Sequence, residues 1–128
     1  MTSKENSLNW FEISVTDIKR AKKFYETIFE IEMYEMNMMD SLMAFFPAEP
    51  GNGKASGALV QSNLHTPSVA GAKIYLNANP DLAPVLARVE SAGGSITIPK
   101  SGINGGEFGY MAFIIDSEGN EVALHSNK

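Results

Sequence analysis

The side chains that could do chemistry are few: the sequence has no cysteine and only two histidines, His65 and His125. The lack of cysteine excludes disulfides, thiolate zinc sites, iron–sulfur clusters and cysteine nucleophiles. Two imidazoles are too few for a mechanism that needs several of them. The motifs of zinc proteases (H-E-x-x-H), serine hydrolases (G-x-S-x-G) and dinucleotide-binding folds are also absent.

Alternation of polar and apolar residues predicts three strands that place polar side chains on one face of a sheet. In residues 8–15, Phe11, Ile13 and Val15 form an apolar row, and the other row points away from it. The strands at 73–78 and 121–126 have the same pattern. Apolar walls with a few polar groups are typical of small-molecule pockets. The candidate ligand-binding residues are Trp10, Glu12, Ser14, Tyr75, Asn77 and His125.

Each of these candidates also has an ordinary structural interpretation. Glu12 is the candidate general base, but a glutamate on a strand is more often simply hydrogen-bonded. His125 lies three residues from the end of the sequence and could be solvated there. Trp10 and Tyr75 could be core or interface aromatics. His65 falls in a connecting segment, and we expect no role for it.

The elements that must position these residues form a pattern that occurs twice. Residues 16–29 have apolar residues at helical spacing, with Thr16 and Asp17 as a helix start. A second helix is predicted at about 82–89, ended by Gly93 and Gly94. The predicted strands are 8–15, 32–38, 42–46 and 56–61 in the first half and 73–78, 95–100, 109–115 and 121–126 in the second. We therefore expect an α+β fold of two similar units joined near residues 62–71.

Composition and charge exclude several classes of partner. The 128 residues are 44% hydrophobic and 20% charged, which is ordinary for a globular protein, and the formal net charge is −5. An acidic balance disfavours nucleic acids and anionic membranes as partners. The polar start and the absence of an apolar run of about 18–20 residues predict a soluble, cytoplasmic protein without a membrane partner.

Five of the seven methionines fall between Met33 and Met43. Ordinary packing of strands explains such a group. A polarisable, adaptable pocket wall is the alternative explanation.

The order of the motifs resembles the vicinal oxygen chelate superfamily, which comprises glyoxalase I, bleomycin-resistance proteins and extradiol dioxygenases. The resemblance covers nearly the whole chain, and it implies two tandem βαβββ units whose curled mixed sheets enclose a cavity. It also implies that residues 1–128 form one domain with repeats at about 8–62 and 72–127. The matching segments are Trp10–Asp17, Arg20–Tyr25 with Phe29, Tyr75–Asn77, Leu86–Gly94, Asp116–Asn120 and Leu124–Ser126.

The resemblance implies divalent-metal ligands at set strand positions, and these positions fall on Trp10, Lys73 and Ala123. Gln61 is the only conceivable ligand at the end of the first repeat. Tryptophan and alanine cannot coordinate a metal, and lysine would have to lose its proton. We therefore expect no metal and no cofactor, although Glu12 and His125 together could form a divergent site.

The leading hypothesis is a metal-independent, glyoxalase/bleomycin-resistance-like protein that binds a small, partly apolar molecule in the sheet cavity. The alternative is a lyase, isomerase or dioxygenase with a divergent metal site or with metal-free acid/base chemistry on Glu12. A third possibility is a structural module whose cavity is filled by side chains. The resemblance, together with the sheet surface that one chain leaves open, also predicts a homodimer.

Overall fold

The structure is a computed structural model that describes residues 1–128 and contains two helices and eight strands. It confirms the predicted α+β fold with two βαβββ units, and most predicted boundaries are within two residues. The first unit consists of β1 (Trp10–Ser14), α1 (Ile18–Phe29), β2 (Tyr34–Met38), β3 (Ser41–Phe45) and β4 (Ser56–Gln61). The second consists of β5 (Tyr75–Asn77), α2 (Ala83–Val89), β6 (Ser95–Gly102), β7 (Tyr110–Ile115) and β8 (Glu121–Ser126).

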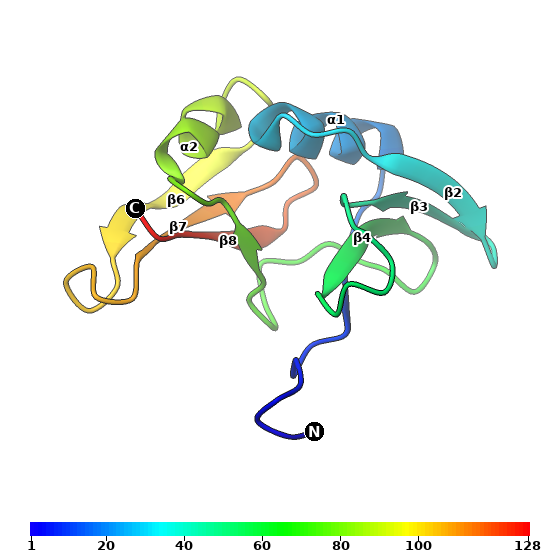
Figure 1. The fold of residues 1–128 in the computed structure, drawn as a ribbon. Helices are drawn as coiled ribbons and strands as arrows, with labels where there is room; N and C mark the ends of the chain where they lie inside the picture. The colour runs from blue at the N-terminus through cyan, green and yellow to red at the C-terminus, as the bar shows by residue number, and fades with distance from the viewer.

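Each unit forms its own four-stranded mixed sheet. The strand orders are β1-β4-β3-β2 and β5-β8-β7-β6. The first strand of each unit pairs in parallel with the last, and the other neighbours are antiparallel. Both helices lie on the same side of the two sheets (Figure 1). As a result, each sheet has one face covered by helices and one open face.

Helix α1 begins at a well-formed cap. The Asp17 carboxylate accepts the Arg20 N–H at 3.1 Å, and the Gln61 side-chain oxygen accepts the Ile18 N–H at 2.9 Å. These bonds satisfy N–H groups that have no partner within the helix. The side-chain oxygen of Gln61 therefore caps α1 and is not available to bind a metal ion. The helix buries one apolar stripe, Ile18, Ala21, Phe24, Tyr25 and Ile28.

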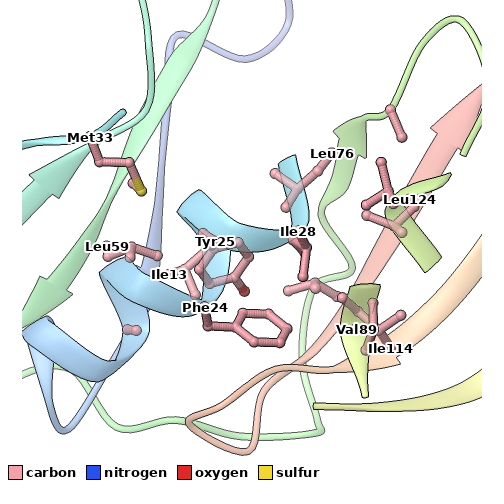
Figure 2. Close-up of a cluster of buried hydrophobic side chains, with 14 of the residues drawn as sticks. Ile13, Phe24, Tyr25, Ile28, Met33, Leu59, Leu76, Val89, Ile114 and Leu124 are labelled. Carbon is pink, nitrogen blue, oxygen red and sulfur yellow. The ribbon is translucent and has the colours of Figure 1, made fainter. Parts of the chain in front are cut away.

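The stripe of α1 is the centre of one core shared by both units. Figure 2 shows Phe24, Tyr25 and Ile28 among residues of both sheets. Gly94 of the second unit shows how closely the helix packs, since a Cβ there would lie 2.8 Å from the Phe24 ring. The apolar rows predicted for the first strands are buried in this core, with Ile13, Val15, Leu76 and Ala78 at its centre and Phe11 and Ile74 at its margin.

A polar contact between the units lies inside this core. The Tyr25 hydroxyl, fully buried on α1, donates to Asp116 Oδ2 at 2.6 Å. Asp116 opens the β7–β8 turn and also accepts the N–H groups of Glu118 and Asn120, both at 2.9 Å. Burial raises the pKa of Tyr25 well above its usual value, and the charge of Asp116 raises it further. The phenol therefore stays a donor to Asp116.

Glu118 makes a second contact from the same turn to α1. Its carboxylate accepts two N–H bonds from Arg20, at 2.7 and 3.0 Å, and the backbone N–H groups of Thr16 and Asp17. Burial by itself would raise the pKa of Glu118. The bonds from Arg20 and the backbone outweigh burial and lower that pKa to about 2.

No helix in the structure is long and apolar enough to cross a membrane.

The lowered pKa of Glu118 predicts a specific pH dependence of stability. Because the folded state prefers ionised Glu118, its contribution is present at neutral pH and is lost as pH falls from about 5 towards 2. Because solvent screens part of this interaction, that contribution is about 1–2 kcal/mol at neutral pH. We expect Glu118→Gln to reduce the free energy of unfolding at pH 7 by about 1–2 kcal/mol and to flatten the decline below pH 5.

Urea unfolding between pH 2 and pH 7 measures both effects. Glu49→Gln is the matched control, since Glu49 is an exposed carboxylate in the β3–β4 loop. Equal pH profiles for the two variants would show that this pH dependence of stability does not come from Glu118.

Candidate functional site

A cleft of about 780 Å³ lies between β1 and β5. These strands are edges of separate sheets and do not pair with each other, so the boundary between the units remains open here. Eleven of the sixteen residues that line the cleft are hydrophobic. Four of the six residues proposed from the sequence are among them, namely Trp10, Glu12, Tyr75 and Asn77.

Aromatic rings line the cleft from both units. The Trp10 ring packs against Phe45, with centroids 5.8 Å apart, and Tyr75 packs edge-on against Phe113 at 5.9 Å. Trp10 nevertheless remains 42% exposed and Tyr75 51% exposed. Each ring therefore has a free surface on which a planar or apolar group can stack.

The structure places His65, for which no role was expected, beside Glu12. His65 Nε2 lies 2.9 Å from Glu12 Oε1, and Nδ1 lies 2.6 Å from the hydroxyl of Ser62. The turn after β4 makes this possible, with the His65 N–H donating to the Ser62 carbonyl at 3.2 Å. Since β4 runs beside β1 in parallel, its closing turn lies next to the Glu12 strand. The Ser62-x-x-His65 spacing was the feature of the sequence that could have indicated this turn and the Ser62–His65 contact.

The hydrogen bonds around His65 define its tautomer. Ser62 Oγ accepts the Leu64 N–H at 3.1 Å, so its own proton is free to be donated to Nδ1. Nε2 then carries the ring proton and donates it to Glu12. The second oxygen of Glu12 accepts the Trp10 indole N–H at 3.3 Å. The result is a continuous chain of hydrogen bonds from Ser62 to Trp10.

Two of the proposed residues lie outside the cleft. Ser14 lines a smaller neighbouring pocket of about 140 Å³, which Glu12 also borders. Asn120 closes that pocket, since its side chain donates to the Ser14 carbonyl at 2.7 Å and accepts the Ser68 N–H at 2.9 Å. His125 is directed elsewhere, because its Nε2 lies 2.9 Å from the Phe108 carbonyl oxygen.

The residues at the expected metal-ligand positions do not fit a divalent ion. The Trp10 indole is a donor to Glu12, and the Lys73 ammonium binds Glu121 and the Val69 carbonyl. Ala123 is fully buried and has no ligand atom in its side chain. Glu12 and His125 have separate partners, and no group of three or more His, Asp or Glu side chains is placed to hold a metal. A divergent Glu12–His125 site therefore finds no support in the geometry.

Comparison with solved structures identifies the fold. Glyoxalase I from Zea mays superposes with a TM-score of 0.70 at 21% identity, over 92% of this chain and 45% of the maize chain. A hypothetical protein from S. aureus gives 0.69 at 17% identity, over 94% of both chains. A glyoxalase/bleomycin resistance protein from Albidiferax ferrireducens gives 0.66 at 16% identity, over 94% of this chain and 98% of the other.

These matches show that the chain has the fold of glyoxalase I and of the glyoxalase/bleomycin resistance proteins, as the order of its motifs indicated. The chain spans less than half of the maize enzyme. No protein-family model and no curated protein matches the sequence.

The tautomer of His65 is directly measurable. We expect long-range ¹H–¹⁵N spectra to show neutral His65 protonated at Nε2, because Ser62 donates to Nδ1. Ser62→Ala removes that donor and should produce a mixture of tautomers at His65. His125, whose Nε2 faces the Phe108 carbonyl, is the internal reference and should not change. A neutral His65 protonated mainly at Nδ1 in the unmodified protein would disprove this hydrogen-bond chain.

Proposed function

The chain has the fold of glyoxalase I and the glyoxalase/bleomycin resistance proteins. We propose that its β1–β5 cleft binds a small, partly apolar molecule without a metal ion. The observation that carries the proposal is the cleft, whose volume of about 780 Å³ lies in the range of small-molecule pockets. Its mostly apolar lining with few polar groups is typical of such sites. An unfilled cleft of this size also weighs against a purely structural module.

The residues that line the cleft would have two kinds of role, stacking and orientation of the ligand. Trp10 and Tyr75 offer stacking surface from opposite units, so that a planar group can lie between the two sheets. Glu12, Asn77 and Lys73 add a small number of polar groups that fix the orientation of the ligand. Since the family's metal positions hold residues that do not fit an ion, binding in this proposal depends on stacking and hydrogen bonds.

The test uses the neutral fluorescent probe N-phenyl-1-naphthylamine. We expect saturable binding with energy transfer from Trp10, because this is the only tryptophan and it lines the cleft. Tyr75→Ala should weaken binding by about fivefold to tenfold, the equivalent of about 1 kcal/mol of lost stacking. Phe108→Ala is the matched control, since Phe108 is exposed but lies outside the cleft.

Metal independence is tested in the same titration. Affinity should be unchanged after dialysis against EDTA and after addition of one equivalent of Zn²⁺, Mn²⁺ or Ni²⁺. No saturable binding, or equal losses in Tyr75→Ala and Phe108→Ala, would refute a binding site in the cleft. Binding that requires a metal would refute metal independence alone.

We further propose that two chains pair through the open faces of their sheets. On the first sheet that face carries Tyr34, Met36 and Met38, all of which are exposed in the single chain. The satellite cluster of Met43, Ala58 and Val60 lies on the same face. An apolar face of this kind is typical of an interface. Met33, in contrast, packs into the helix-covered core. In this proposal, the methionines at 33–43 therefore contribute both to the core and to the pairing face.

The expected outcome for assembly is a dimer in sedimentation velocity. Met36→Lys should give a monomer of about 14 kDa, because it would bury an unpaired charge in the interface. Met39→Lys is the control, since Met39 lies in the β2–β3 turn and is 92% exposed. A monomeric unmodified protein, or a dimer that tolerates Met36→Lys, would contradict pairing through this face.

A further inference from the structure

We propose that Met36, Met38 and Met43 form a binding site for a soft monovalent metal ion, Cu(I) or Ag(I), on the open face of the first sheet. Three neutral thioether sulfurs of the β2–β3 hairpin hold the ion. None of the three residues lines the β1–β5 cleft, so this site is separate from the binding function proposed above.

The pairing of β2 with β3 brings the three side chains together. Met36 lies directly opposite Met43, and Met38 follows Met36 by two residues, so all three lie on the same face of the sheet. Opposite residues have Cβ atoms about 4.5–5.5 Å apart, and diagonal neighbours such as Met38 and Met43 are about 7–8 Å apart. Methionine is unbranched and has three rotatable bonds. All three sulfurs can therefore reach one point above the sheet.

The turn between the strands fixes this arrangement. Met39 and Asp40 are the only two residues between β2 and β3, and their φ angles are 50° and 62°. Positive φ at both positions is typical of the tight hairpin turn that sets the register of the strands it joins. A slip of one residue would move Met36 and Met43 to opposite faces of the sheet. The backbone therefore determines which sulfurs can meet.

The burial of the three side chains gives the site a floor and an entrance. Met43 is only 9% exposed and packs against Ala58 and Val60 in the satellite cluster. Met36 and Met38 are half-exposed in the single chain. An ion can therefore reach the sulfurs from solvent and lie above an apolar surface, as a metal site with an entry path requires.

The fold itself does not require methionine at these positions. Strands favour β-branched and aromatic residues. The corresponding hairpin of the second unit, β6–β7, contains a single methionine, Met111. The grouping of methionines is therefore a property of the first hairpin and not of the repeated unit.

The chemistry of the ligands selects the ion. Thioether sulfur is a soft ligand that favours Cu(I), whereas Mg²⁺, Ca²⁺ and Mn²⁺ prefer oxygen. The chain has no cysteine, so its methionines are its only soft ligands. A thioether has no proton to lose, so binding does not compete with protonation as it does at an imidazole. The net charge of −5, with Asp40 in the adjoining turn, favours the approach of a cation.

The test uses Ag(I), which resembles Cu(I) but is stable in air. Silver nitrate is titrated in chloride-free buffer into protein labelled with ¹³C at the methionine methyl groups. We expect saturation at one ion per chain, with shifts in the methyl signals of Met36, Met38 and Met43. Met33, in the helix-covered core, and Met111, in the second sheet, should not shift. Cu(I), added anaerobically as its acetonitrile complex, should shift the same three signals, and Mn²⁺ should shift none.

Replacement by leucine removes the sulfur and nearly conserves the volume, so the fold and the apolar face are kept. We expect Met36→Leu and Met38→Leu each to weaken silver binding by at least about tenfold, because even groups around metal ligands change affinity by about 10–100-fold. Met111→Leu is the matched control and should bind silver as the unmodified protein does. All three sulfurs belong to one chain, so these results do not depend on whether two chains pair.

The pH dependence separates a thioether site from a histidine site. The affinity for silver should be unchanged between about pH 5 and pH 8, whereas binding at His65 or His125 would weaken as the imidazole gains a proton. A fall in affinity with imidazole protonation would overturn the inference. Methyl shifts that spare the three proposed ligands, or equal affinities of Met38→Leu and Met111→Leu, would overturn it as well.

Discussion

The contact between α1 and the β7–β8 turn determines how the two halves of this protein are arranged. Tyr25 and Arg20 come from the first unit, and Asp116 and Glu118 come from the second. A buried phenol bonded to a carboxylate is expensive to separate, because either partner alone would be left unsatisfied in the core. Since β1 leads directly into α1, and β8 follows the turn, this contact ties the first sheet to the second. The cleft between β1 and β5 lies along the same boundary between the units.

The cleft is open because the edge strands β1 and β5 belong to separate sheets. The sheets meet through helix side chains on one face and through Asn120 at one end of β1, but no strand hydrogen bonds join them along the boundary. Edge strands with unpaired neighbours are costly when buried, and a ligand or a second chain can cover them. The aromatic rings of Trp10 and Tyr75 lie at this boundary and not in the core. The candidate binding residues therefore lie where no strand pairing joins the two sheets.

Much of the fold followed from local patterns, and part of the site did not. The alternation of Ile13 and Val15 with Glu12 and Trp10 predicted correctly which row is buried and which is open. Alternation along a strand predicts the sheet face on which a side chain lies, but not the residues that it contacts. His125 was therefore grouped with Glu12, although it binds the Phe108 carbonyl. His65 was missed for the opposite reason. It lies on no strand, and its place beside Glu12 depends on the turn after β4 and on the pairing of β4 with β1. Gln61 could not be assigned to the cap of α1 without that same pairing.

The two units have the same layout, but the origin of His65 makes them chemically unequal. Val15 and Ala78 close the buried rows of the two first strands, so Glu12 and Tyr75 stand at equivalent positions. The imidazole that binds Glu12 comes from the segment joining the units, and a chain of two units has only one such segment. The hydrogen bonds of Glu12 to His65 and Trp10 therefore have no counterpart at Tyr75. The two units share one layout and differ in the polar contacts along their first strands.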